Sequence, residues 1–352
     1  MEAMARYSIA LLPGDGIGPE VVNAARRVLE KAAANLDFAT YDWGSEYYFR
    51  HGVMMPPDAL QRLRQHDAIL LGAVGHADIP DHITLNGLLL PIRRGFDLWA
   101  NVRPAYLYAG VESPLKGYGP GSIDMVVVRE NTEGEYAQAG GFVHHYFPAE
   151  VAVQTSVFTR HGVERIIRFA FELAMQRGRL KRVTSITKSN AQAYGMVLWD
   201  RVFREVAAEY PGIQTESLLV DAAAMNFVRR PESFDVVVAS NLFGDILSDL
   251  SAIVTGSIGL APSANLDPSR SAPSLFEPVH GSAPDIAGKG VANPLGTVLA
   301  AAMMMEHLGE AAVAGAMEKA VREVLAEGRV LTPDLGGQAN TAEVVEALLA
   351  RL

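Results

Sequence analysis

The chain has 352 residues, which is enough for two domains with a large buried core. Hydrophobic residues make up 49% of the sequence and charged residues 20%, and the formal net charge of −10 argues against a nucleic-acid-binding protein, which would present a basic face. Cysteine is absent, which excludes disulfides and cysteine-bound zinc. No apolar run could cross a bilayer and no secretion leader is recognisable, so we expect a cytoplasmic protein that does not bind membranes.

Strand and helix patterns alternate along much of the chain. An apolar strand at Tyr7–Leu12 leads through a turn at Pro13–Gly18 into an amphipathic helix from about Pro19 to Ala34. Further short apolar or β-branched runs predict strands at Ala39–Tyr41, Ala68–Leu71, Met125–Arg129, Arg182–Thr187, Thr215–Val220 and Val236–Ser240. A helical pattern follows each of the last three. This alternation predicts an α/β architecture with largely parallel central strands.

Two segments are ambiguous from pattern alone. Residues Thr132–Val151 are rich in glycine and aromatic residues without a helical period, so they form either a loop or a β-arm used in dimerisation, and we favour the arm. The turn Gly14–Gly18 lies where a dinucleotide fingerprint would lie, but the position of the third glycine is Pro19. Because proline is a good first residue of a helix, a simple tight turn explains this segment as well as nucleotide binding does.

The strongest chemical signal is the helical pattern that follows the strand Val236–Ser240. Asp245 and Asp249 are four residues apart, which places both carboxylates on one helix face, about 6 Å apart at Cβ. A hard divalent cation such as Mg²⁺ or Mn²⁺ would remove their mutual repulsion. From spacing alone, two solvated acidic side chains remain the more common arrangement.

Three arginines, a tyrosine and a lysine form a second set of candidates. Arg93, Arg103 and Arg129 lie near the ends of predicted elements, where their planar forks could hold a dicarboxylate, although each alone would more often be a surface ion-pair partner. Tyr136 and Lys188 could serve as acid and base once their surroundings shift their pKa values. Glycine and small residues in 277–294 would let a ligand approach the backbone, and His280 lies within that segment.

Seven segments together resemble the β-decarboxylating dehydrogenases, a family that includes isopropylmalate, isocitrate, homoisocitrate and tartrate/D-malate dehydrogenases. Each motif is modest alone, but they occur in the family's order along essentially the whole chain, which makes the set very specific. The segments are Pro13–Glu20 (PGDGIGPE), Ile92–Pro104 (IRRGFDLWANVRP), Val128–Tyr136 (VRENTEGEY), Thr187–Asn190 (TKSN), Val220–Met225, Asn241–Asp249 and Glu277–Pro294.

The resemblance implies an isopropylmalate dehydrogenase-like fold rather than a Rossmann fold. It implies two α/β domains around a shared mixed sheet, with an outer domain at residues 1–98 and 257–352 and an inserted central domain at 99–256. A β-arm would support a homodimer in which the two subunits share their active sites.

The resemblance also implies a role for each candidate residue. Arg93, Arg103 and Arg129 would grip the substrate, Tyr136 would protonate the enol carbon after CO₂ leaves, and Lys188, from the partner subunit, would assist removal of the hydroxyl proton. Asp245 and Asp249 would bind Mg²⁺ or Mn²⁺ together with Asp221 of the second subunit, and K⁺ is a further candidate ion. The NAD site would be formed by Glu277, His280, Gly281, Ser282, Ala283, Asp285, Ile286 and Asn293.

The implied substrate is a small 2-hydroxy dicarboxylate. Gly87 and Leu89 stand where isocitrate enzymes carry a polar pair, which argues against isocitrate. Several segments, among them Pro80-Asp81-His82-Ile83, resemble the tartrate/D-malate group, although Asn86 and His76 depart from its pattern. We therefore predict NAD-dependent decarboxylation of D-malate or tartrate, with 3-isopropylmalate or another 3-substituted malate as the alternatives. A non-catalytic regulatory subunit would lack one of the catalytic residues, all of which are present.

Overall fold

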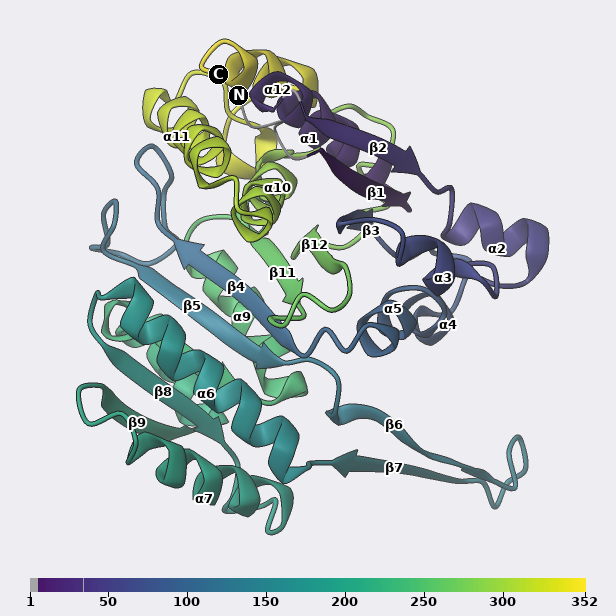
Figure 1. The fold of residues 1–352 in the computed structure, drawn as a ribbon, viewed down its shortest axis with the longest axis vertical. Coiled ribbons are helices and arrows are strands. Elements are labelled where there is room, and N and C mark those ends of the chain that lie inside the picture. Colours follow the sequence, from purple (N-terminus) through teal and green to yellow (C-terminus); the bar gives the residue numbers. More distant parts are fainter. Residues whose placement is uncertain (1–5, 34) are drawn as a thin grey trace. The chain divides into compact units, whose positions relative to one another are not determined.

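The computed structural model describes residues 6–33 and 35–352 (Figure 1). The chain forms two compact units. The first unit comprises Met1–Leu98, Arg103–Ile123 and Ser251–Leu352, and the second comprises Trp99–Val102 and Asp124–Leu250. Strand β4 (Ala100–Tyr106) contributes residues to both units. The predicted domains, 1–98 with 257–352 and 99–256, stay a prediction, because compactness within one chain does not establish independent folding.

The first unit contains a mixed sheet whose strands run in the order β2-β1-β3-β12-β11. Strand β1 is parallel to both of its neighbours, and β12 is parallel to β3 but antiparallel to β11. The strand bounds are β1 Tyr7–Gly14, β2 Leu36–Thr40, β3 Ala68–Ala73, β11 Pro262–Leu266 and β12 Ser274–Pro278.

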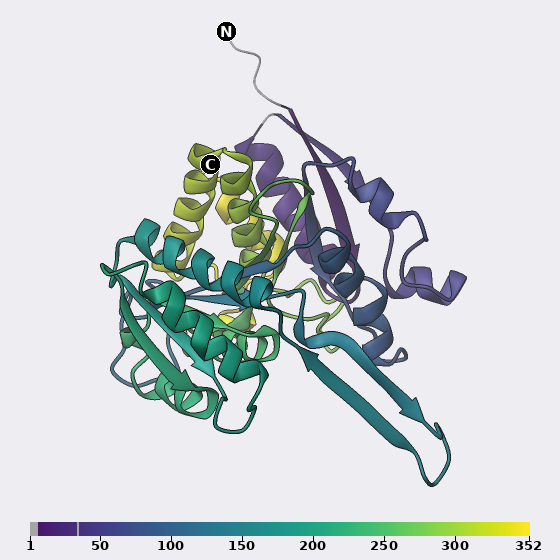
Figure 2. The ribbon, with the colours of Figure 1, turned by 60° about the horizontal axis from the view of Figure 1, so that its bottom comes forward.

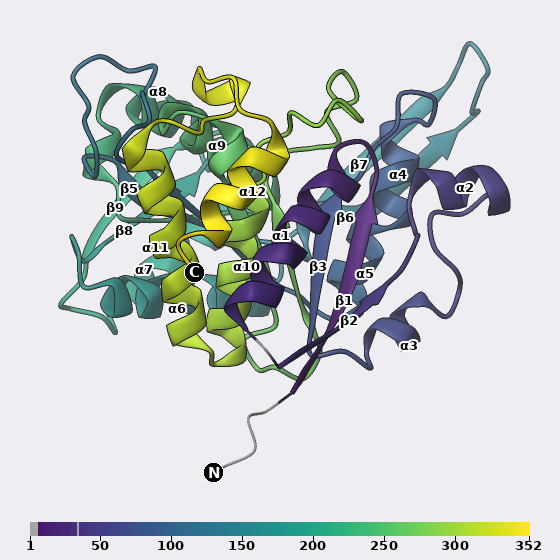
Figure 3. The same ribbon diagram turned by 90° about the horizontal axis from the view of Figure 1, so that it is seen from above.

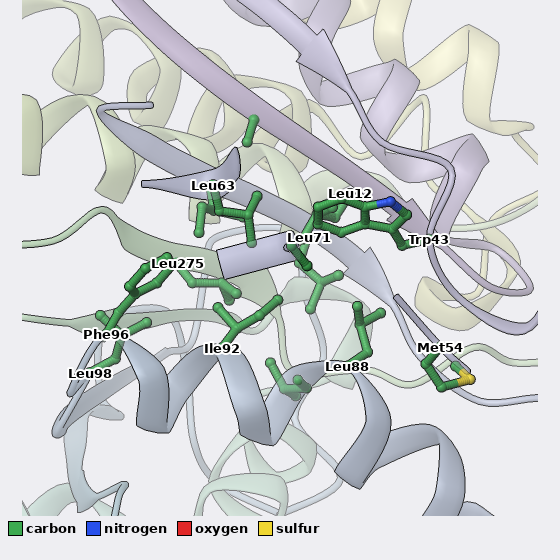
Figure 4. Packing of buried hydrophobic residues seen from close by; sticks show 14 residues of the cluster. Leu12, Trp43, Met54, Leu63, Leu71, Leu88, Ile92, Phe96, Leu98 and Leu275 are labelled. Atoms are coloured by element: carbon green, nitrogen blue, oxygen red, sulfur yellow. The ribbon is translucent and has the colours of Figure 1, made fainter. Parts of the chain in front are cut away.

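Helices cover both faces of this sheet (Figure 3). Helix α1 packs on β1 and β3, and α10 packs on β11 and β12. On the other face, alternate strand side chains such as Leu12 and Leu71 pack with Leu88 and Ile92 in one apolar cluster (Figure 4). The helices of this unit are α1 Gly18–Ala32, α2 Ser45–His51, α3 Ala59–Leu63, α4 Asp81–Gly87, α5 Leu89–Gly95, α10 Leu295–Leu308, α11 Ala311–Glu327 and α12 Thr341–Leu349, with short 3₁₀ turns at Ile258–Leu260 and Pro333–Leu335.

The second unit contains four parallel strands in the order β5-β10-β8-β9. Valine pairs such as Val127–Val237 and Val128–Val238 are buried at its centre, as expected for parallel strands covered on both faces. The elements are β5 Asp124–Glu130, β8 Arg182–Thr187, β9 Gln214–Leu219, β10 Val236–Ala239, α6 Arg160–Arg177, α7 Gly195–Ala207, α8 Val220–Arg229 and α9 Asn241–Val254, with a 3₁₀ turn at Pro231–Ser233. The end of α9, from Ser251, belongs to the first unit.

A two-stranded antiparallel hairpin extends from the second unit (Figure 2). Its strands are β6 (Gly134–Val143) and β7 (Val151–Val157), and every residue of β7 is exposed. The hairpin also exposes large apolar side chains, including Phe142 and Phe147. The ambiguous segment is therefore an arm rather than a loop, as favoured above, whereas its part in dimerisation stays a prediction.

The predicted α/β architecture with mainly parallel central strands is confirmed. Most predicted strands match within two residues, although β2 begins at Leu36, three residues before the predicted Ala39. The first helix ends at Ala32, and its predicted end at Ala34 lies outside the described residues. Within the described part of the chain, no helix combines the length and apolar character needed to span a membrane.

Candidate functional site

The glycine turn after β1 has a packing role. Gly14 has a φ of 68°, and a Cβ there would lie 2.0 Å from the carbonyl oxygen of Ala73. The buried carboxylate of Asp15 accepts hydrogen bonds from the backbone N–H groups of Ser45 (2.7 Å) and Gly75 (2.8 Å). The turn therefore fixes the loops that follow β2 and β3, which agrees with the simple tight turn considered from the sequence.

Arg93 and Glu277, predicted to bind substrate and cofactor, form a buried ion pair with each other. The Arg93 Nη2 atom donates to Glu277 Oε1 at 2.7 Å, and Asn265 Nδ2 donates to the same oxygen at 2.8 Å. Within residues 6–33 and 35–352, nothing accepts a hydrogen bond from Arg93 Nε. Glu277 thus holds a buried cation that still has a donor to offer, and a carboxylate ligand could accept that hydrogen bond.

His280 lies in the predicted NAD segment 277–294 with its imidazole buried. Burial lowers its pKa below the usual range for histidine, and Nδ1 lies 3.0 Å from the carbonyl oxygen of Gly281. That contact requires the proton on Nδ1, which leaves Nε2 as an acceptor; within the described residues Nε2 has no hydrogen-bond partner. A buried acceptor without a donor is what a polar ligand such as a dinucleotide would satisfy.

The rest of this loop is fastened to the start of α1. The carbonyl of Ser282 accepts from Ile17 N at 2.9 Å, and Ile286 and Ala283 pack against a small cluster that contains Ile17. Glu20 accepts from Ala292 N at 2.9 Å and from the hydroxyl of Thr341. The loop is therefore anchored at both ends.

Exposure separates the remaining predicted cofactor residues. Gly281 and Asp285 are exposed and available to a ligand. Asn293, in contrast, donates from Nδ2 to Asp334 at 2.9 Å and accepts at Oδ1 from Leu295 N at 3.0 Å. Its side chain therefore joins Asp334 to the first residue of α10, which gives Asn293 a packing role in addition to the predicted cofactor role.

A charged cluster lies at the carboxyl end of β5 in the second unit. Arg129, which is 2% exposed, donates from Nη1 to Asp245 Oδ1 and from Nη2 to Asn241 Oδ1 at 2.7 Å. The hydroxyl of Tyr136 donates to Asp245 Oδ2 at 3.0 Å, and its ring lies 5.3 Å from the Arg129 guanidinium carbon. Three predicted site residues, two from the segment Val128–Tyr136 and one from Asn241–Asp249, are thus in direct contact.

Close packing of α9 on β5 makes this cluster possible. A Cβ at Gly244 would lie 2.6 Å from the Cβ of Arg129, so only glycine lets the helix approach this near. Asp245 and Asp249 lie on α9 as the spacing predicted, with Asp245 partly buried and Asp249 exposed. Arg103 is buried in β4.

Lys188 and Asp221, both predicted to serve the active site of a partner subunit, form a pair at the surface of the second unit. Lys188 Nζ donates to Asp221 Oδ1 at 2.9 Å, and this contact lowers the pKa of the Asp221 carboxyl. In the part of the chain that the structure describes, no three His, Asp or Glu side chains meet at a metal-sized site. Asp221 therefore does not join Asp245 and Asp249 within one chain.

The sequence did not single out the acidic residues that fix the start of the arm. Glu130 is buried, which raises the pKa of its carboxyl to about 7, and it accepts from Thr132 N and Glu133 N. Glu133 accepts from Thr159 N at 2.9 Å at the start of α6, and Glu135 accepts from Leu242 N at 3.2 Å at the start of α9. Carboxylates at helix amino ends are stabilising, but Thr159 and Leu242 are too distant in sequence from Glu133 and Glu135 for a local pattern to reveal these two contacts.

The family model for isocitrate/isopropylmalate dehydrogenase matches residues 8–348. The chain belongs to this dehydrogenase family. The predicted fold class is thereby confirmed, and the crystal structure of isocitrate dehydrogenase from Methylococcus capsulatus agrees with it. That structure has a TM-score of 0.89 and 40% sequence identity, and the match covers 98% of this chain and 99% of the other.

Three relatives of this family member are about half identical to it over nearly their whole lengths. A probable tartrate dehydrogenase/decarboxylase of Agrobacterium vitis is 53% identical, covering 98% of this chain and 97% of the relative. The D-malate dehydrogenase [decarboxylating] of Escherichia coli K12 is 52% identical, and the tartrate dehydrogenase/decarboxylase of Pseudomonas putida is 50% identical, each covering 98% of both chains. The predicted resemblance to the tartrate/D-malate group is confirmed.

Proposed function

We propose that this enzyme catalyses the NAD- and metal-dependent oxidative decarboxylation of a 2-hydroxy dicarboxylate, with D-malate or tartrate as the substrate. The observation that carries the proposal is the contact of Arg129, Tyr136 and Asp245 at the end of β5. It puts an anion-binding fork, a phenol and a candidate metal ligand at one point, which is the set that this reaction needs. The relatives named for tartrate and D-malate support the choice of substrate.

The residues divide the chemistry among them. Arg129 would orient a substrate carboxylate together with Arg93 and Arg103, because paired N–H groups match its two oxygens. Lys188 would assist removal of the proton from the C2 hydroxyl, and Tyr136 would deliver a proton to C3 after CO₂ departs. A bound NAD⁺ would supply the hydride acceptor for C2, and a bound divalent cation would supply Lewis-acid character near the C2 oxygen.

The donor set fits Mg²⁺ or Mn²⁺, with K⁺ as a further candidate. Asp245 and Asp249 offer hard carboxylate oxygens from one helix face. Asp221 of a second copy would complete the set, which requires α8 and α9 to lie at a subunit interface.

Exposed apolar side chains on these helices support such an interface. Ile246 and Ile253 are 56% and 47% exposed and lie on the same face of α9 as Asp249. Met225 and Val228 are 63% and 46% exposed on α8, the helix that carries Asp221. Large exposed apolar side chains are typical of interaction sites, and we propose a homodimer whose active sites are shared.

The segment before Arg93 argues against isocitrate as the substrate. A Cβ at Gly87 would lie 2.5 Å from Cγ of Met54, so Met54 already fills the space that a serine side chain would need. This disfavours isocitrate and leaves 3-isopropylmalate or another 3-substituted malate as the alternative.

A substrate panel tests the proposed reaction. NADH formation should be measured with D-malate, both tartrate enantiomers, 3-isopropylmalate and isocitrate, each with Mn²⁺ and with a chelator. We expect the highest kcat/KM for D-malate or a tartrate and loss of activity in the chelator. Isopropylmalate as the best substrate would replace the substrate assignment, whereas activity with none of the five would overturn the proposed function.

We further expect the enzyme to prefer NAD⁺ over NADP⁺ by about 30- to 1,000-fold in kcat/KM, the effect of one unfavourable charge contact. Asp285 is exposed on the loop that begins at His280, and its carboxylate can accept hydrogen bonds from ribose hydroxyls but would repel a 2′-phosphate. An Asp285→Lys variant should lower the ratio of kcat/KM for NAD⁺ to that for NADP⁺. The control Glu112→Lys makes the same charge change at another exposed position of the first unit, and it should leave this ratio unchanged. A ratio near one in the wild type would show that Asp285 does not face the ribose.

A further inference from the structure

A polar pocket of about 270 Å³ lies in the first unit where strands β1 and β3 begin. Its charged and polar lining includes Arg64, His66, Asp67, Arg270, Ser271 and His307. The glycine turn and the loop around His280 adjoin the opposite, carboxyl end of β1, which is eight residues long. At about 3.3 Å per residue, roughly 25 Å of strand separates the two places, so this pocket is distinct from the proposed NAD site.

Two arginines supply positive charge to this pocket. Among residues 6–33 and 35–352, no carboxylate lies within ion-pair distance of Arg64 or Arg270. Arg64 lies over the ring of Phe96 at 5.1 Å, which limits its freedom. Arg270 has a φ of 56°, an uncommon conformation for a residue with a side chain.

The other ionisable groups of the lining offset only part of the positive charge of the two arginines. His66 is bonded at both ring nitrogens, to Ser8 Oγ at 2.7 Å and to Tyr41 Oη at 2.8 Å. Burial and the charge of Arg270 lower the pKa of His307 to about 4, so it is neutral at pH 7. Asp67 is the opposing carboxylate in the lining, and its Oδ2 accepts from Ser8 N at 2.7 Å.

Two further acceptors beside the pocket are already bonded. Asp267 is paired through Oδ1 with Ser269 Oγ and through Oδ2 with Ser271 Oγ, each at 2.6 Å. At the carboxyl end of α10, the carbonyl of Leu308 accepts from the Tyr7 hydroxyl at 2.9 Å. The lining thus carries two guanidinium groups and one carboxylate, and the serine-bonded carboxylate of Asp267 adds a second negative charge beside it.

We propose that this pocket binds a small tetrahedral oxyanion, either inorganic phosphate or the phosphate group of a small monoester, held by Arg64 and Arg270. Guanidinium forks match phosphate oxygens in geometry and charge. The neutral His307 ring, which has no hydrogen bond within the described residues, is available as a further donor. The proposal concerns a site apart from the catalytic one and does not depend on the reaction assigned above.

Titration calorimetry at constant ionic strength tests the proposal with three anions: phosphate, glycerol 3-phosphate and the dicarboxylate malonate. The informative variant is Arg270→Gly, which removes the cation while suiting the positive φ, so that folding is not at risk. Arg329→Ala, a change of equal charge at an exposed position of the same unit, is the control, and Arg64→Gln tests the second arginine.

We expect the wild type and Arg329→Ala to bind phosphate equally, and Arg270→Gly and Arg64→Gln to bind it at least tenfold more weakly, as for the loss of a charge-assisted hydrogen bond. Tighter binding of glycerol 3-phosphate than of phosphate would identify a monoester as the ligand, and the reverse order would identify the free anion. Absence of phosphate binding up to about 20 mM, or equal binding by Arg270→Gly and the wild type, would overturn the proposal, as would malonate binding as tightly as either phosphate compound.

Discussion

Asp245→Asn should lower kcat at least about 100-fold and weaken Mn²⁺ binding, because it removes one hard anionic ligand. The substitution also removes the charge that faces Arg129 Nη1, whose side chain is 2% exposed. A buried cation that loses its counter-charge is costly, so Arg129 would also hold a substrate carboxylate less well. Turnover measured over a range of Mn²⁺ concentrations, together with calorimetric Mn²⁺ binding, separates the two effects.

The matched control for this variant is Glu172→Gln, which makes the same charge change at an exposed position on α6 of the same unit. Its turnover and Mn²⁺ affinity should equal those of the wild type. Both proteins should be compared by circular dichroism and by their melting temperatures without metal, so that loss of folding is recognised. Unchanged turnover of Asp245→Asn at low Mn²⁺ would remove Asp245 from the proposed metal site.

Local patterns in the sequence predicted the elements that carry the site. The four-residue spacing of Asp245 and Asp249 placed both on one helix, and the apolar run before Arg129 placed that arginine at a strand end. These predictions succeeded because helix and strand periodicity are properties of neighbouring residues. The seven motifs then indicated the family.

Long-range pairing was beyond such patterns. Asn241 accepts from Arg129, 112 positions away, and donates to the carbonyl of Glu133, 108 positions away. Glu20 accepts a hydrogen bond from the hydroxyl of Thr341, which lies 321 positions away in the sequence. A pattern can mark these polar residues as unusual, but their partners are determined only when strands and helices pack.

Two residues that were predicted to bind ligands contact each other within the protein. Arg93 was predicted to bind substrate and Glu277 to bind cofactor, yet they bind each other at 2.7 Å. A buried arginine requires a counter-charge even without a ligand, so Glu277 stabilises the folded chain whatever else it contacts. Motif positions identify residues near a site without separating those that contact a ligand from those that hold its neighbours.

Tyr136→Phe should slow decarboxylation about 10²- to 10⁴-fold, the usual range for loss of a general acid, while slowing hydride transfer much less. Phenylalanine keeps the ring beside Arg129 and removes only the hydroxyl that donates to Asp245 Oδ2 at 3.0 Å. Decarboxylation of oxaloacetate with Mn²⁺ measures the first half of this comparison. Reduction by NADH of a 2-keto acid that lacks the second carboxylate measures hydride transfer alone.

Tyr210→Phe is the matched control for this variant, because Tyr210 stacks on Phe171 at 4.9 Å in the same unit and makes no side-chain hydrogen bond within the described residues. Both of its rates should equal those of the wild type. If Tyr136 only positioned Asp245, Tyr136→Phe would weaken Mn²⁺ binding and slow both reactions alike, and saturating Mn²⁺ would restore them. A selective loss of decarboxylation that saturating Mn²⁺ does not restore therefore identifies the phenol as the proton donor, and equal slowing of both reactions would reject that role.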